Sequence, residues 1–122
     1  MARILVVDDE PSIRELIKEV LSMAGHEIDQ AGDGSEAVAA VNKKAYDLVI
    51  MDRNMPKTDG ILALTLMHCN AKLKGLKVIM CTSVSVTKEV DEAFAAGATD
   101  YVLKPINLQM LLNKVAKALA KP

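Results

Sequence analysis

The chain has 122 residues, of which 51% are hydrophobic and 25% are charged, with 15 Lys and Arg against 16 Asp and Glu. This length suits one domain with its own apolar core, so we expect a single domain over residues 1–122 with no second, output domain. A net charge of −1 and three aromatic residues argue against nucleic-acid binding. No apolar run approaches the roughly 20 residues of a membrane span, and no signal-peptide pattern is present. We therefore expect a cytoplasmic protein.

Short β-branched runs predict five strands in chain order. The predicted strands are residues 3–7, 27–31, 46–51, 77–81 and 99–103. Four of them are almost continuously apolar, which is typical of parallel strands that are buried on both faces. The run at 27–31 is weaker.

Helical periodicity fills the intervals between these runs. The predicted helices are residues 11–24, 34–43 and 60–70, a segment marked by Val90, Phe94 and Gly97, and residues 108–119. Pro11 suits the first turn of the first helix and Gly25 suits its end. Asp33 and Glu36 resemble a capping pair, and Asn107 is the expected N-cap of the last helix.

The order is therefore strand–helix, repeated five times. It predicts a doubly wound (βα)5 domain, in which one parallel sheet has helices on both faces. In such sheets, ligands bind outside the carboxyl ends of the strands.

Polar residues follow or end four of the predicted strands. Asp8 and Asp9 follow the first strand, and Asp52 follows Leu48–Met51. Thr82 and Lys104 follow the fourth and fifth strands. Because parallel strands end at one edge of the sheet, three carboxylates, a hydroxyl and an ammonium group are expected to share one cleft.

This set of groups suits a divalent cation and a phosphoryl group. Three crowded carboxylates repel one another, and Mg²⁺ relieves that repulsion through oxygen ligands. Asn54, two residues beyond Asp52, is a candidate to add a backbone carbonyl. We expect Asp52 to be the nucleophile, since a carboxylate can form an acyl phosphate. Lys104 and Thr82 are expected to contact phosphoryl oxygens.

At this point the chain resembles a response-regulator receiver domain of two-component signalling, most of all the stand-alone chemotaxis type. The resemblance covers nearly the whole chain. It is carried by Asp8-Asp9, Asp52-Arg53-Asn54-Met55-Pro56 with Asp59-Gly60, Thr82, Ala96-Gly97-Ala98, Tyr101 and Lys104-Pro105. It implies a flavodoxin-like sheet with strand order 2-1-3-4-5.

The resemblance also implies a phosphorelay function. Asp52 would become a 4-aspartylphosphate by accepting a phosphoryl group from the phosphohistidine of a histidine kinase or histidine phosphotransfer protein. Asp9, Asp52 and the Asn54 carbonyl would bind Mg²⁺ directly, and Asp8 through water. The bond between Lys104 and Pro105 would be cis. The protein would assist only its own phosphorylation and dephosphorylation and would not be an enzyme for other substrates.

A switch follows from the same resemblance. Thr82 would move toward the phosphoryl group, and Tyr101 would turn into the vacated space. A downstream target would sense the face formed by helix four, strand five and helix five, on a protein expected to be monomeric. For Val84 and Val86, partner contact and packing against the sheet remain equally open.

Three departures from the family pattern bear on rival hypotheses. Ser83 stands where Ala or Gly is usual, Ile106 where an aromatic residue is common, and Arg53 where an apolar or aromatic residue is more usual. Ser83 favours an alternative, a degenerate receiver that works as a constitutive adaptor. A metal phosphatase with Asp8 as nucleophile is disfavoured, because Glu10 stands where a second aspartate is expected.

Overall fold

The computed structural model describes residues 2–53, 55, 59–73, 75–82, 92 and 94–120. Expectations that concern Asn54, Ser83, Val84, Val86 and Val90 lie outside the described residues. Of the expected fourth helical segment, Glu92, Phe94 and Ala95 are helical, and Gly97 lies in the turn that follows, with a φ of 110°.

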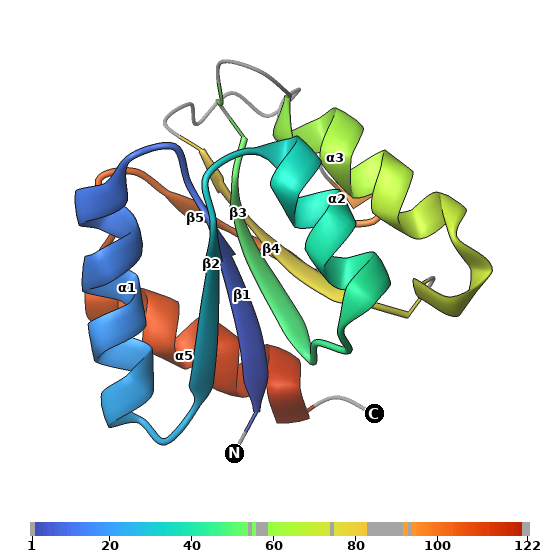
Figure 1. Ribbon diagram of the computed structural model, residues 1–122. Coiled ribbons are helices and arrows are strands. Elements are labelled where there is room, and N and C mark those ends of the chain that lie inside the picture. The colour runs from blue at the N-terminus through green and yellow to red at the C-terminus, as the bar shows by residue number, and fades with distance from the viewer. Residues whose placement is uncertain are drawn as a thin grey trace.

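A five-stranded parallel sheet forms the centre of the molecule, in the order β2-β1-β3-β4-β5 (Figure 1). The strands are β1 (Arg3–Val7), β2 (Glu27–Ala31), β3 (Leu48–Asp52), β4 (Lys77–Thr82) and β5 (Asp100–Leu103). This confirms the predicted fold class and strand order. The register pairs Asp52 with Cys81 and Thr82 with Leu103, so the strands end at one common edge.

Helices α1 (Pro11–Met23) and α5 (Leu108–Ala120) cover one face of the sheet. Pro11 opens α1 as predicted, and Gly25 follows its end with a φ of 94°. The Asn107 side chain accepts a hydrogen bond from Met110 N at 3.0 Å, which confirms the predicted cap of α5. The core on this face contains Ile4, Val6, Ile17, Leu21, Leu48, Ile50, Ile79, Cys81, Val102, Leu111, Val115 and Ala118.

Helices α2 (Gly34–Lys43) and α3 (Gly60–Cys69) cover the opposite face, and a short 3-10 helix, η1 (Ala71–Leu73), follows α3. Asp33 caps α2 as predicted by accepting from Glu36 N at 2.8 Å, and Glu36 in return accepts from Gly32 N. The core beneath α2 and α3 includes Leu5, Val7, Ala37, Val41, Val49, Met51, Ala63, Leu64, Met67, Val78 and Met80.

The predicted third strand was placed two residues too early. Tyr46 belongs to the approach to β3, because its hydroxyl donates to Asp29 of β2 at 2.6 Å. The Asp47 carboxylate accepts from Arg3 N at 2.8 Å, and Asp47 N donates to the Arg3 carbonyl at the same distance. Two side-chain contacts and one backbone hydrogen bond thus hold the segment that precedes β3.

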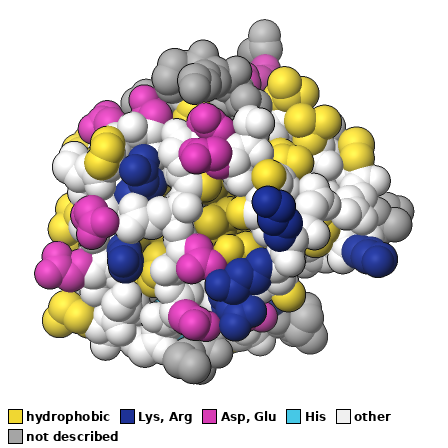
Figure 2. Space-filling model, in the orientation of Figure 1, with side chains coloured by type: hydrophobic (Ala, Val, Ile, Leu, Met, Phe, Trp, Pro, Cys, Tyr) yellow, Lys and Arg dark blue, Asp and Glu magenta, His cyan; other side chains and the backbone are white. Residues whose placement is uncertain are grey.

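Helix α3 is apolar on nearly all sides, so its buried face could not be assigned from the sequence. The structure buries Ala63, Leu64 and Met67 and leaves Leu62 and Leu66 about half exposed. Figure 2 shows hydrophobic side chains gathered over this helix at the upper right. Among the residues described, no helix is long and apolar enough to cross a bilayer.

Candidate functional site

Of the five side chains expected to share one cleft, four belong to residues that end a strand or directly follow one, and three of those four are buried. Asp8 follows β1, Asp52 and Thr82 end β3 and β4, and Lys104 follows β5. Asp8 is 2% exposed, Asp52 3% and Thr82 5%, which is unusual for polar side chains at the rim of a sheet. The fifth residue, Asp9, is exposed.

Three carboxylates converge at this edge. One oxygen each of Asp8, Asp9 and Asp52 lies within 4.8 Å of the others. Carboxylate oxygens are the donors that Mg²⁺ and Ca²⁺ prefer, and an exposed member leaves the site open to water and ligands. The donor set therefore fits a hard divalent cation, as expected from the sequence. Asn54, the fourth expected ligand, lies outside the part of the chain that is described.

Lys104 places a cation on two of these carboxylates. Its Nζ lies 3.0 Å from Asp52 Oδ2 and 3.6 Å from Asp8 Oδ2. Burial alone would lower the pKa of Lys104, but the hydrogen bond and charge of Asp52, with the charge of Asp8, outweigh it and raise that pKa. The ammonium group therefore stays charged at neutral pH and offsets part of the carboxylate repulsion.

Backbone contacts fix Asp8 in place. Asp8 N donates to the Ala31 carbonyl at 3.2 Å, and the guanidinium of Arg14 donates to the Asp8 carbonyl at 2.6 Å. The Asp8 Oδ1 accepts from Glu10 N at 2.9 Å, which orients the start of α1. One carboxylate oxygen of Asp8 thus accepts a backbone hydrogen bond, and the other faces Lys104. Arg14 was not expected from the sequence, since helical spacing alone does not reveal such a contact.

The turn after Asp52 is clamped between β4 and α3. Arg53 N donates to the Cys81 carbonyl at 2.8 Å, and the Arg53 carbonyl accepts from Gly60 N at 2.9 Å. A Cβ atom on Gly60 would lie 2.6 Å from the Asp52 carbonyl oxygen. Helix α3 can therefore begin this close to the turn only because residue 60 has no side chain. The Asp59 side chain caps the helix by accepting from Ile61 N at 2.9 Å.

The last strand joins the site through its backbone. Lys104 N donates to the Thr82 carbonyl at 2.7 Å, which carries the pairing of β4 and β5 to the edge where Lys104 turns inward. The peptide bond between Lys104 and Pro105 is cis, as the resemblance implied.

Tyr101 lies next to this edge, between two side chains. Its ring meets Phe94 edge-on, with centroids 5.9 Å apart, and Lys114 Nζ stands 4.5 Å from the ring centroid. Lys114 also contacts the Tyr101 carbonyl and Asp100. The structure thus places Tyr101 beside the end of the fourth helical segment and beside α5. Sequence spacing gave no sign of the Lys114 contact.

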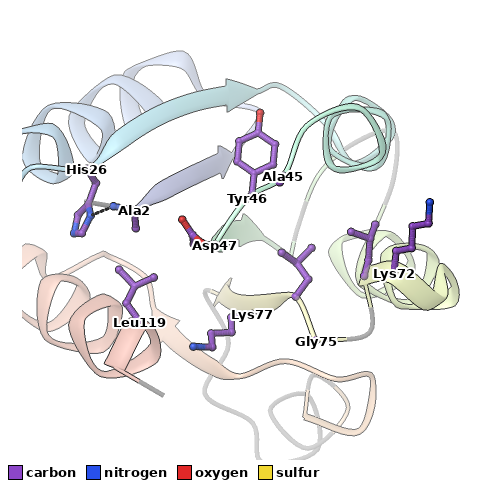
Figure 3. A pocket seen from close by; sticks show the side chains of 11 residues that line it. Ala2, His26, Ala45, Tyr46, Asp47, Lys72, Gly75, Lys77 and Leu119 are labelled. Carbon is purple, nitrogen blue, oxygen red and sulfur yellow. Dashed lines mark hydrogen bonds between the residues drawn. The ribbon is translucent and has the colours of Figure 1, made fainter. Parts of the chain in front are cut away.

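A hollow of about 730 Å³ lies at the other end of the sheet, beside the amino ends of the strands (Figure 3). Its lining includes His26, whose Nδ1 accepts from Ala2 N at 3.2 Å, and also Tyr46, Asp47 and Lys77. No carboxylate of the acidic cluster contributes to this lining. Size alone would therefore point away from the residues that can do chemistry.

The fold and this edge define a receiver domain of two-component signalling. Residues 4–116 match the family described as the response regulator receiver domain, and the chain belongs to that family. Phosphorylation and Mg²⁺ binding at an acidic pocket are general features of it.

Three relatives show the range of the similarity. The chemotaxis protein CheY of Bacillus subtilis is 36% identical over 119 residues, which are 96% of this chain and 97% of that protein. The crystallised chemotaxis protein CheY4 of Vibrio cholerae is 34% identical, with a TM-score of 0.92 over 97% of this chain and 98% of that one. The Thermotoga maritima response regulator TrrA, solved in complex with Mg²⁺ and BeF, is 42% identical, with a TM-score of 0.85 over 97% and 99% of the chains.

Other relatives are longer. The regulator RpaA of Synechocystis is 31% identical over 99% of this chain, but the match spans only 50% of RpaA. For the sensor kinase CqsS of Vibrio cholerae the matched share is 17% of that protein. The chain therefore covers half or less of some of the curated relatives it matches.

Proposed function

We propose that this domain is a Mg²⁺-dependent phosphoacceptor switch in which Asp52 takes a phosphoryl group from a phosphohistidine. One observation carries the proposal. Asp52 is 3% exposed and has Lys104 Nζ at 3.0 Å, and the carboxylates of Asp8 and Asp9 converge on it at the carboxyl edge of the sheet. A buried carboxylate between a cation and a metal-binding acid pair suits phosphoryl transfer, which depends on positioning and charge neutralisation.

In the proposed reaction, an oxygen of the Asp52 carboxylate attacks the phosphorus of the donor. A P–O bond forms to Asp52 as the P–N bond to the donor imidazole breaks, and the imidazole leaves as it takes up a proton. Lys104 stabilises the negative charge on one phosphoryl oxygen, and the Thr82 hydroxyl donates to another. A bound Mg²⁺ supplies charge neutralisation. Asp9, Asp52 and the Asn54 carbonyl would hold it directly, and Asp8 through water.

The proposed output surface is the face of the fourth helical segment, β5 and α5. Phe94 is 43% exposed and packs against the Tyr101 ring. Leu103 is 39% exposed and lies two residues after Tyr101 in β5. A movement of Thr82 toward the phosphoryl group would change the space available to the Tyr101 ring. A target that binds this face would then distinguish the phosphorylated protein from the unphosphorylated one.

The proposed phosphoryl donor is a histidine kinase or a histidine phosphotransfer protein. An apolar groove of about 300 Å³ borders Lys104, lined by Glu10, Ile13, Leu16, Ile17, Pro105, Ile106 and Leu108. A donor helix with an apolar face fits such a groove. Because histidine kinases use ATP, we place this exchange in the cytoplasm. We further propose that the receiver domain is monomeric.

The decisive experiment incubates the protein with Mg²⁺ and a small acyl phosphate and measures intact masses of the wild type and Asp52→Asn. One phosphoryl adduct on the wild type, absent from Asp52→Asn and absent in excess chelator, is the expected result. Labelling that persists in chelator would contradict the metal assignment. If neither the small acyl phosphate nor purified histidine kinases label the wild type, the result would favour the constitutive adaptor.

A further inference from the structure

We propose that the ion pair between Arg53 and Glu92 opposes the switch by tying the helical turn that contains Glu92 and Phe94 to the residue next to the phosphoacceptor. The pair is not part of the phosphoryl-binding set and was not predicted from the sequence. The inference rests on the proposed function, because it assigns a role to what surrounds Asp52.

The geometry of the pair is that of a strong contact. Arg53 Nη2 lies 2.9 Å from Glu92 Oε2, although the two residues are 39 positions apart in the chain. The Arg53 side chain is 13% exposed and that of Glu92 45%. A charge-assisted contact with one largely buried partner is worth more than a pair in open water. Arg53 thereby joins two distant segments of the chain at the edge of the sheet.

One end of this pair is fixed to the site. The Arg53 backbone is held on both sides, by the Cys81 carbonyl on β4 and by Gly60 N at the start of α3. The Cα atom of Arg53 therefore cannot move unless the turn that carries Asp52 moves as well.

The other end of the pair belongs to the segment that leads to Tyr101. The Glu92 carbonyl accepts from Ala96 N at 3.0 Å, so Glu92 lies in the same helical turn as Phe94. Phe94 in turn packs against the Tyr101 ring. A continuous set of contacts thus connects the residue beside the phosphoacceptor with the proposed switch residue.

The charge that phosphorylation adds predicts the sign of the coupling between the ion pair and the phosphorylated state. A carboxylate carries one negative charge, whereas a phosphorylated side chain carries about two. The additional charge would arise one residue from Arg53 and compete with Glu92 for the guanidinium. If phosphorylation weakens the ion pair, the ion pair must oppose phosphorylation by the same free energy. Weakening the pair by mutation should therefore favour the phosphorylated conformation.

The test is a double-mutant cycle on the binding of Mg²⁺-beryllofluoride, a phosphoryl analogue, measured by calorimetry. We expect Glu92→Gln to tighten binding about two- to fivefold, the scale of a partly buried ion pair. In an Arg53→Met background, Glu92→Gln should have no effect, because the partner is absent. Glu19→Gln removes an exposed carboxylate from α1 and should leave the affinity unchanged.

A second readout follows the conformation itself. Without beryllofluoride, the amide resonances of Phe94 and Tyr101 in Glu92→Gln should shift toward their positions in the beryllofluoride-bound wild type. Glu92→Gln lies on a half-exposed side chain, so the variant is expected to fold.

The outcomes separate the two proposals. Equal tightening by Glu92→Gln in both backgrounds would show a general charge effect and overturn the inference alone. An unchanged affinity in the wild-type background would also overturn it. Beryllofluoride binding that is the same in the wild type and Asp52→Asn would instead refute the proposed function, and the inference would fall with it.

Discussion

At the scale of single residues, the site is a balance of charge. Asp8, Asp9 and Asp52 present three carboxylates to one another, and Lys104 reaches two of them. An excess of negative charge at one buried place lowers stability until a cation neutralises it. The carboxylates that form the candidate site therefore also lower the stability of the fold until a cation binds.

Lys104→Ala should separate these two effects. We expect the unfolding free energy in urea, without Mg²⁺ and at neutral pH, to fall by about 1–2 kcal/mol as a charge-assisted contact is lost. Mg²⁺ binding should persist, since the carboxylates remain. Phosphorylation of Asp52 should no longer change the amide spectrum around Tyr101 or the affinity for a target. A normal response of target binding to phosphorylation would count against the role of Lys104.

The two thiols should differ sharply in reactivity. Burial and the nearby negative charges of Asp52 and Asp8 raise the pKa of Cys81 to about 12, although the positive charge of Lys104 acts in the opposite direction. Cys69 is exposed. Because the thiolate is the reactive form, iodoacetamide at pH 8 should alkylate Cys69 and spare Cys81 in the folded protein. Peptide mass spectrometry after timed quenching measures this, with urea-unfolded protein as the control in which both react.

At the scale of elements, the sequence predicted most of what the structure contains. β1, β2 and α2 have their predicted bounds. A continuous apolar run marks β1 and a capping pair marks α2, whereas β2 was predicted from a weaker run. The start of β3 was wrong because Tyr46 is β-prone but bonds to Asp29 on another strand. The meeting of Asp8, Asp52 and Lys104 followed from the strand-end rule for parallel sheets.

The contacts that escaped prediction join residues with no shared local pattern. Arg53 and Glu92 are 39 positions apart, and Lys114 meets Tyr101 across the space between α5 and β5. Such pairs depend on side-chain lengths and on how helices seat on the sheet. Periodicity records neither of these properties.

The start of α3 yields a prediction at this scale. In Gly60→Ala, the new methyl group would lie 2.6 Å from the Asp52 carbonyl oxygen and 2.7 Å from Arg53 Cα. Backbone atoms cannot give way as a side-chain tip can, so we expect a loss of about 1–3 kcal/mol in the urea unfolding free energy despite the better helix propensity of Ala. Gly75→Ala is the control, since no described atom beyond the chain neighbours lies within 4 Å of its Cβ position. Equal stabilities of the two variants would refute the close approach.

At the scale of the whole molecule, the sheet separates a stable interior from a responsive edge. Two apolar cores, one on each face, meet at strands β1, β3 and β4, whose residues are almost entirely buried. Charge and ligand chemistry collect at the carboxyl ends of the same strands. A cation bound there should therefore stabilise the fold as a unit.

Mg²⁺ should consequently raise the melting temperature. At a concentration 100-fold above its dissociation constant, a ligand specific for the native state adds about 2.7 kcal/mol, which corresponds to roughly 10 °C for a domain of this size. Differential scanning fluorimetry with and without chelator measures the shift. Asp9→Asn removes an exposed candidate ligand and should reduce the shift strongly. A shift of the same size in that variant would remove Asp9 from the metal site.

Ala2 and Leu119 both line the hollow at the amino ends of the strands, at the opposite end of the sheet from Asp52 (Figures 1 and 3). Polypeptide attached at either end of the domain would therefore emerge on the side remote from Asp52, the proposed phosphoacceptor. A dye, a surface tether or a fused protein placed there leaves the approach of a phosphoryl donor open. Attachment points and the candidate site thus lie at opposite ends of the sheet, so that the domain can be joined to other molecules without blocking the site.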